Sequence, residues 1–187
     1  MAALLVLFGC VRPVVATAPA PEPIVGAVVD WYTLDGADRV ELLESCMRRC
    51  PRDDRGNLVS SVTTWRLAWQ WTRTSADTCE VAGAVVDADI TVRLPEWEPP
   101  DEADAGLVED WHAWSVALRR HEQGHVDVVR SMVHDAEARL AEAGCAGADA
   151  AGNGLERAVW RAQQDYDRLT ASGHAQGASF WNFQVFD

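Results

Sequence analysis

The sequence ALRRHEQGHVDVVRSM, residues 117–132, contains the spacing H-E-x-x-H at His121, Glu122 and His125. On a helical wheel of about 100° per residue with Leu107 at the origin, the large apolar residues near this stretch gather within about 40° of that origin. They are Trp111, Trp114, Leu118, Val129 and Met132. His125 falls on the origin, and His121 and Glu122 lie about 40° and 60° from it. The stretch is therefore expected to form a helix whose buried face contains both histidines.

A bound zinc ion would explain these polar side chains on a core-facing stripe, where they are costly unless another group satisfies them. Because side chains at i and i+4 point the same way, His121 and His125 can reach one ion at the distance of about 2.0–2.1 Å that zinc requires. Glu122 would lie beside the ion as the general base that takes a proton from water. Gly124 costs about 1 kcal/mol relative to alanine within a helix, which indicates that backbone or substrate approaches closely there. The competing interpretation is a pair of core histidines hydrogen-bonded to the sheet.

Strands are predicted in the first half of the chain and long helices in the second, which is an α+β pattern. A β-rich run covers residues 24–32, and a helix with an apolar face follows over residues 37–50. In residues 61–73 and 81–95 apolar and polar residues alternate with the period of a strand. The connection between these two runs is short, so we expect them to pair as antiparallel neighbours.

The helix that carries the motif is predicted over residues 107–143, after a proline- and acid-rich linker at 95–106. The loop GCAGADAAGNG, residues 144–154, should separate it from a second helix over residues 155–171. Residues 24–187 are thus predicted to form one domain, in which an antiparallel sheet packs against the motif-bearing helix and a second, C-terminal helix.

Tryptophan is abundant, with nine residues in a chain of 187. Trp65, Trp69 and Trp71 share one face of a predicted strand, and Trp111 and Trp114 lie on the buried face of the motif helix. We expect one aromatic layer between sheet and helix. A surface that binds sugars or peptides is the alternative.

The formal net charge of −13 argues against a nucleic-acid partner, because no basic stripe is present to neutralise phosphates. Residues 1–23 begin with an apolar run too short to span a bilayer, and Leu-Phe-Gly-Cys at its end resembles a bacterial lipobox with Cys10 as the lipidated residue. A Pro/Ala-rich tether follows. We therefore expect a secreted or cell-envelope protein, with possible membrane attachment through Cys10. The alternative for the apolar run is an N-terminal strand.

Four cysteines remain in the domain, and an even number in an exported protein predicts two disulfides. Cys46 and Cys50 lie on a predicted helix, so each is expected to bond to a distant partner, one to Cys79 and the other to Cys145. A metal site at the C-x-x-x-C spacing is the competing interpretation, although it lacks a second pair of ligands.

Several segments resemble the DUF922 family, bacterial exported proteins regarded as zinc-dependent proteases. They cover most of residues 29–180 and are WYTLDGAD, TTWRLAWQW, ADITVRLPEW, RRHEQGHVD and YDRLTASGHAQG. The closing segment of the family has the pattern Y-D-x-x-T-x-H-G-x-x-Q-G. This chain has Ser172 where that pattern has histidine, and His174 follows two residues later.

Zinc requires a third protein ligand, and His112 and His134 fall on the opposite face of the motif helix. The resemblance makes His174 the first candidate, as a replacement for the histidine missing at 172, and Asp167 the second. Tyr166 is expected either to donate a hydrogen bond to a developing oxyanion or to pack as a half-buried aromatic residue.

The motif and the resemblance together imply a zincin-like α+β domain with one Zn²⁺ ion. Its expected activity is hydrolysis of peptide or amide bonds in a peptide or protein substrate, with Glu122 as general base and acid. One alternative is a non-catalytic cell-envelope protein that retains a structural or vestigial metal, which the departure at Ser172 favours. A second alternative is a metal-free module that contacts a ligand through its tryptophan face.

Overall fold

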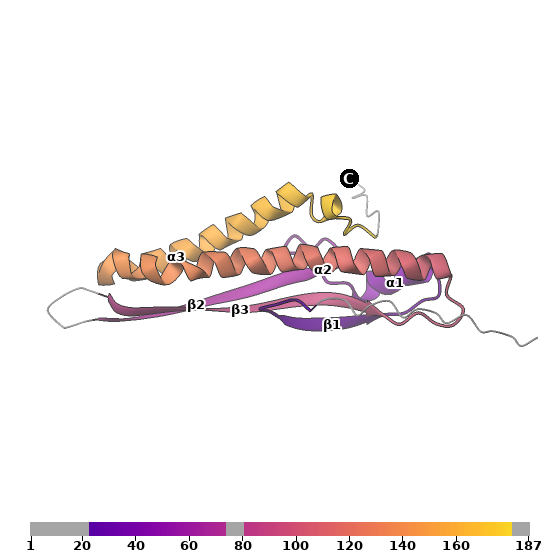
Figure 1. Cartoon of the computed structure of the whole chain (residues 1–187), viewed down its shortest axis with the longest axis horizontal. Helices are drawn as coiled ribbons and strands as arrows, with labels where there is room; N and C mark the ends of the chain where they lie inside the picture. The colour runs from indigo at the N-terminus through magenta and orange to yellow at the C-terminus, as the bar shows by residue number, and fades with distance from the viewer. Residues whose placement is uncertain (1–22, 74–80, 181–187) are drawn as a thin grey trace, which may run out of the picture.

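Two layers make up the structure, a computed structural model that describes residues 23–73 and 81–180. Three strands form a sheet, and two long helices run along one face of it (Figure 1). This arrangement confirms the predicted α+β class. Residues 1–22, with most of the predicted signal segment and tether, lie outside the described residues.

The sheet is mixed, with the strand order β1-β3-β2. Its strands are β1 (Val28–Leu34), β2 (Val62–Arg73) and β3 (Val81–Trp97). β2 and β3 pair antiparallel as predicted, whereas β1 runs parallel to β3. The expectation of a purely antiparallel sheet is therefore wrong for β1, because the helix α1 (Arg39–Arg49) and β2 carry the chain back before β3 enters between the two other strands.

The alternation of side chains turns one face of the sheet toward the helices. In β2, Leu67 is buried while its neighbours Arg66 and Ala68 are exposed, and in β3 Ile90 and Val92 are buried. Successive strand residues point to opposite faces, so the period of two that predicted these strands also sets which residues reach the core. The core lies between this face and the helix layer.

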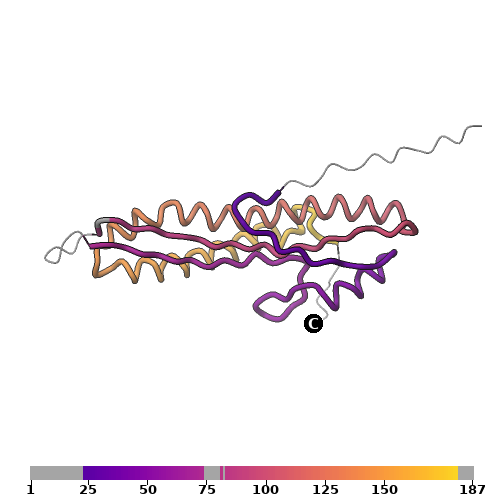
Figure 2. The backbone as a smooth tube through the Cα atoms, turned by 90° about the horizontal axis from the view of Figure 1, so that it is seen from below, coloured from indigo at the N-terminus to yellow at the C-terminus, as the bar shows by residue number. Residues whose placement is uncertain are grey.

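The helix layer is a hairpin of α2 (Ala105–His134) and α3 (Ala136–Thr170). α2 begins at Asp104, whose side chain accepts a hydrogen bond from the amide of Leu107 at 3.0 Å. The helical path is broken at Gly144, with φ 63° and ψ 175°, a conformation that glycine adopts without steric cost. Figure 2 shows the chain doubling back in this part of the helix layer. None of the helices in the described ranges is long and apolar enough to cross a membrane.

The predicted loop at residues 144–154 is wrong, because helix resumes directly after Gly144. The predicted end of the long helix at residue 143 nevertheless agrees with the position of the reversal. Ala148 and Gly152 are buried in this stretch and pack on the rest of the molecule. The small residues that predicted a loop instead allow close packing of the helix. A Cβ at Gly152, for example, would overlap the indole of Trp69.

The tryptophans of strand and helix pack in or against one core between the sheet and the helices, as predicted, but their rings are not in one continuous cluster. Trp97, Trp111 and Trp114 cluster at one end of the core, with ring centroids 5.3 Å and 4.8 Å apart between neighbours. Trp69 instead packs beneath Gly152 of α3, toward the other end of the sheet. The aromatic residues therefore fill two separate places along the sheet.

Cys46 and Cys50 form a disulfide with each other, with their Cα atoms 4.7 Å apart. The predicted bonds from these two residues to Cys79 and Cys145 are therefore wrong. Helix α1 ends before Cys50, which adopts an extended conformation, φ −59° and ψ 143°, and thereby lets its side chain turn back to Cys46. Cys79 lies outside the described residues.

Candidate metal centre

The hairpin of α2 and α3 brings three donor side chains together. His121 and His125 come from α2 and Asp167 from α3, and Asp167 lies as far beyond Gly144 as His121 lies before it. The Nε2 atoms of the two histidines are 3.3 Å apart. Asp167 Oδ1 lies 3.1 Å from His125 Nε2 and 3.5 Å from His121 Nε2. These three side chains form a group that could hold a metal ion.

Gln163 fixes the tautomer of His125. Its Nε2 donates a hydrogen bond to the backbone oxygen of His125 at 2.9 Å, so its Oε1 is the atom that faces His125 Nδ1. An amide oxygen only accepts hydrogen bonds, so Nδ1 carries the proton. His125 Nε2 therefore presents a lone pair to the cluster.

Gln176 fixes the tautomer of His121 through a longer chain of hydrogen bonds. The hydroxyl of Tyr166 donates to the backbone oxygen of His121 at 3.2 Å and accepts from Gln176 Nε2 at 3.1 Å. Gln176 Oε1 then faces His121 Nδ1 at 2.9 Å and accepts its proton. Both rings thus point a lone pair at the same place, and their partners lie on α3 and the short helix η1 (His174–Gln176) rather than on the sheet.

The donor atoms fit a zinc ion in type and in spacing. Two imidazole nitrogens and one carboxylate oxygen are a donor set that zinc uses in catalytic sites. Tetrahedral ligands at about 2.0–2.1 Å from a metal are roughly 3.3–3.4 Å from one another, and the three separations here are 3.1, 3.3 and 3.5 Å. Three acceptors that face each other repel unless a cation or a proton lies among them.

The electrostatics of the cluster show how strongly it attracts positive charge. Burial lowers the pKa of His125, but its hydrogen bond with Asp167 and the charges of Glu122 and Asp167 outweigh burial and leave the pKa above its usual value. For Asp167, burial raises the pKa, but the hydrogen bonds with His121 and His125 outweigh it and hold the pKa well below its usual range. Within the described ranges, no lysine or arginine forms an ion pair with the carboxylate of Glu122 or with that of Asp167.

Glu122 of α2 faces the start of β2. Its side chain is 3% exposed, and its two carboxylate oxygens accept hydrogen bonds from the hydroxyls of Ser61 and Thr63, each at 2.5 Å. Ser61 and Thr63 are two residues apart along an extended chain, so both side chains reach the same face. Neither residue was predicted from the sequence, although Thr63 is a polar residue on the core-facing side of the predicted strand.

Tyr166 explains the glycine in the motif. Its ring stacks on that of His121, with centroids 5.3 Å apart and planes at 16°, and a Cβ on Gly124 would overlap its hydroxyl. A close approach at Gly124 was predicted correctly, but it is made by this side chain and not by backbone or substrate. Because the hydroxyl proton is directed to the backbone of His121, it is not directed toward a substrate in this structure.

His174 lies outside the cluster, exposed on η1. The structure thus brings Asp167, the second candidate for the third ligand, to the histidines and leaves the first candidate apart. Ser172 is also exposed, at the turn between α3 and η1. Of the residues that the sequence analysis missed, Gln163 could have been found from its position four residues before Asp167, because side chains at i and i+4 share a helix face.

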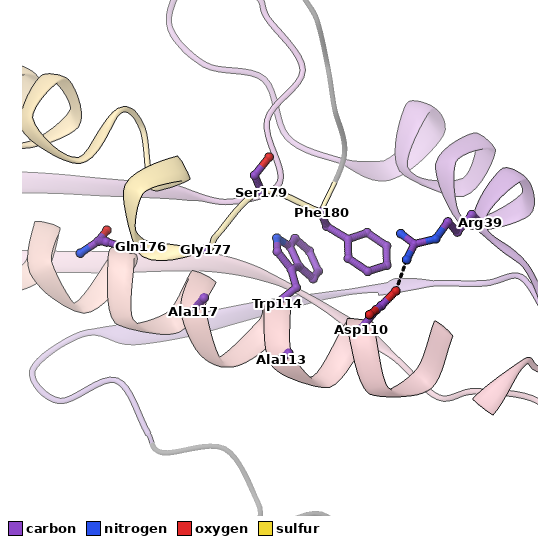
Figure 3. Close-up of a pocket in the computed structure, with 9 residues that line it drawn as sticks. All are labelled: Arg39, Asp110, Ala113, Trp114, Ala117, Gln176, Gly177, Ser179 and Phe180. Atoms are coloured by element: carbon purple, nitrogen blue, oxygen red, sulfur yellow. Dashed lines mark hydrogen bonds and ion pairs between the residues drawn. The ribbon is translucent and has the colours of Figure 1, made fainter. Parts of the chain in front are cut away.

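A cavity of about 450 Å³ lies next to the cluster, along α2 on the side of α1 (Figure 3). Ala117 and Gln176 line the end nearest to His121, and the ion pair between Arg39 and Asp110 lies at the other end. Its volume is within the range of pockets that bind small ligands, about 300–1,000 Å³.

The chain was compared with protein families, curated proteins and solved structures. The model of a family described as "Bacterial protein of unknown function (DUF922)" matches residues 29–175. Those residues include His121, His125 and Asp167, and they end one residue before Gln176. Neither the curated proteins nor the solved structures gave a match.

Proposed function

The chain belongs to the DUF922 family, and we propose that it is a zinc-dependent hydrolase of peptide or amide bonds, with His121, His125 and Asp167 as the metal ligands. The observation that carries the proposal is the direction of the lone pairs. Each Nδ1 is occupied by a glutamine oxygen, so both Nε2 atoms and Asp167 Oδ1 are left as acceptors around one point. No lysine or arginine of the described residues pairs with the carboxylates of Glu122 and Asp167. Their negative charge therefore favours binding of a divalent cation.

A zinc ion bound there would act as a Lewis acid and lower the pKa of a coordinated water to about 7. Glu122 is the residue that we assign to proton transfer. Each oxygen of its carboxylate has two acceptor positions, so the hydroxyls of Ser61 and Thr63 orient it without using up its capacity. It accepts a proton from the attacking water at a carboxylate oxygen and donates it to the amide nitrogen that leaves.

Tyr166 and the two glutamines hold the histidines in place. Imidazole ligands of a metal almost always donate their other ring N–H to a partner, which fixes the ring and its tautomer. Gln163 accepts from His125, and Gln176 accepts from His121 while Tyr166 fixes the direction of that amide. We assign Tyr166 to positioning His121, rather than to stabilising an oxyanion, because its proton has another acceptor.

We further propose that the protein is secreted or attached to the cell envelope. The sequence of residues 1–23 predicts a signal with a lipidated Cys10. The disulfide between Cys46 and Cys50 supports this, because disulfides persist in oxidising compartments and are rare in the cytosol. The substrate would then be an extracytoplasmic peptide or protein.

A second candidate function is a non-catalytic envelope protein in which the metal has a structural role. The burial of Glu122 favours it, because a carboxylate that is 3% exposed and bonded to two hydroxyls also serves as a link between α2 and β2. The same residues therefore support a structural and a catalytic assignment, and only a measurement of turnover separates them.

The test combines metal analysis and turnover in protein purified without a histidine tag. We expect one zinc per chain. Because two histidines and one carboxylate also bind Fe(II), iron is measured in the same samples. Glu122→Gln should keep the zinc and lose hydrolysis of a broad peptide library, whereas Glu156→Gln, at an exposed position of α3, should keep both.

Absence of stoichiometric zinc would refute the metal assignment. One bound zinc with no hydrolysis by the wild-type protein would refute the peptidase and leave the structural alternative.

A further inference from the structure

The cavity beside the cluster follows the same face of α2 as the first metal ligand. Ala113, Ala117 and His121 are four residues apart from one to the next, so they lie in one row along the helix. Ala113 and Ala117 both line the cavity, which runs from η1 toward α1 (Figure 3). With a rise of about 1.5 Å per residue, the two alanines lie about 12 and 6 Å from His121 along the helix axis.

Gln176 belongs to both the cavity and the cluster. Its side chain lines the cavity, and its Oε1 accepts the hydrogen bond from His121 Nδ1 at 2.9 Å. Gln176 therefore lies between the cavity and the cluster. A ligand that fills the cavity contacts the same side chain that orients His121.

The cavity has an apolar part and a polar part. Ala113, Ala117 and Phe180 form the apolar part, with the centroid of the buried Trp114 ring 4.8 Å from that of Phe180, and Gln176 and Ser179 contribute polar side chains. The charged groups that line it are Arg39 and Asp110, which pair with each other at the end away from His121, and both are more than half exposed. A charged ligand side chain would lose hydration there without an unpaired opposite charge to meet it.

We propose that this cavity receives an apolar side chain of a peptide substrate, two to four residues from the amide that reacts at the cluster. The proposal rests on the proposed function. The spacing follows from geometry, because an extended peptide advances about 3.3 Å per residue and the alanine row lies about 6–12 Å from His121. The structure therefore predicts a peptidase that selects large apolar residues at one side of the cleaved bond.

Hydroxamates test the proposal without requiring turnover, because the hydroxamate group binds zinc by itself. Binding to the zinc-loaded full chain is measured by calorimetry for acetohydroxamic acid and for peptide hydroxamates with leucine, phenylalanine or aspartate at each of the first four positions. We expect leucine and phenylalanine two to four residues from the hydroxamate to bind at least about tenfold more tightly than aspartate at the same position, as burial of two or more methylene groups requires.

Ala117→Leu fills the cavity and should remove this preference while zinc content and affinity for acetohydroxamic acid stay unchanged. Ala113→Leu, one turn farther from Gln176, gives a second test if the first variant does not fold. Val116→Leu, on the exposed side of α2, is the matched control and should keep the preference.

Equal affinity for leucine, phenylalanine and aspartate at every position would overturn the cavity assignment and leave the metal centre intact. A preference that survives in both filled variants would overturn it as well. A chain that binds neither zinc nor acetohydroxamic acid would refute the proposed function, and the inference would fall with it.

Discussion

The hairpin of α2 and α3 is held together in two different ways along its length. We call residues 126–159, on both sides of the reversal, the apolar half. It includes the buried side chains of Val126, Leu140, Leu155 and Val159. Beyond it, residues 160–170 of α3 contain no buried side chain. Figure 1 shows this part of α3 rising away from the sheet. We call residues 160–170, with the part of α2 that they face, the site half.

The site half is joined to α2 by polar contacts in place of apolar ones. Gln163, Tyr166 and Asp167 contact His121 and His125 through hydrogen bonds and ring stacking. Burial of apolar surface stabilises the first half whatever the site contains. The second half includes three acceptors that repel one another unless a proton or a cation lies among them, so its attachment depends on which of these is bound. The fold therefore does not depend on the metal centre, and the metal centre can be lost while the fold is kept.

Asp167→Ala is the change with the largest expected effect on the site half. Structural zinc binding of about 10–16 kcal/mol shared among four ligands corresponds to about 2.5–4 kcal/mol for one ligand, or a loss of about 70- to 900-fold in zinc affinity. The metal-free variant should unfold at a lower urea concentration than the metal-free wild type, because it loses the hydrogen bonds with His121 and His125 that hold the pKa of Asp167 below its usual range. Competition with a chelator measures the affinity. Asp165→Ala, on the same helix but paired outward with Arg168, is the control and should bind zinc normally.

Leu140→Ala tests the apolar half. Leu140 is 1% exposed, so its truncation removes buried methylene groups and leaves a cavity, at a cost of about 3 kcal/mol in the free energy of unfolding. At temperatures where the variant is folded, its zinc affinity should equal that of the wild type. Urea unfolding of the metal-free proteins gives the first quantity, and Leu169→Ala, at a position 77% exposed, should change it by less than about 0.5 kcal/mol. A large loss of zinc affinity in folded Leu140→Ala would show that the halves are coupled.

How much of this could be predicted from the sequence differs between the two halves as well. The period of the apolar residues in α2 correctly predicted that His121, Glu122 and His125 are buried, because helix geometry alone sets which residues share a face. The antiparallel pair β2 and β3 followed from alternation in the same way. These are local patterns, and local patterns are what a single sequence records.

Contacts across the hairpin could not be predicted in this way. Asp167 reaches the histidines because the reversal occurs at Gly144. From the sequence, the small residues after that glycine were predicted to form a loop. Gln163 and Gln176 then acquire their roles from distances that depend on the same reversal. The disulfide was predicted wrongly for a related reason, because the extended conformation of Cys50 after the end of α1 is a feature of the backbone that helical periodicity does not contain.

Gln163→Ala should have a smaller effect than loss of a ligand. It removes the acceptor of the His125 Nδ1 proton, and partners of this kind typically contribute 10- to 100-fold to metal affinity, about 1.4–2.7 kcal/mol. Gln164→Ala, the exposed neighbour, is the matched control and should bind zinc like the wild type. Equal affinities of the two variants would mean that the orientation of the ring is set by packing alone.

Acidification should act in opposite directions on the metal-free and the zinc-loaded protein. In the metal-free protein the pKa of His125 is raised: burial opposes protonation, but the hydrogen bond with Asp167 and the charges of Glu122 and Asp167 outweigh it. Its contribution to stability is therefore complete below the unfolded pKa of about 6.5 and is lost as the pH rises through the higher folded pKa. The lowered pKa of Asp167 makes a contribution that is already complete above about pH 3.9, so it does not vary between pH 6 and 8.

Zinc reverses this dependence, because it binds only the unprotonated ring. Below the raised pKa of His125, each zinc ion must displace a proton, and its affinity should fall by about tenfold per pH unit. Thermal unfolding at pH 6, 7 and 8, with chelator and with excess zinc, measures both trends. The metal-free protein should gain stability toward pH 6, and the increment that zinc adds should shrink. His134→Asn, exposed at the end of α2, should leave both slopes unchanged. An increment from zinc that is the same at all three pH values would mean that no proton leaves the cluster when zinc binds, and the assignment of His125 Nε2 as a ligand would then be wrong.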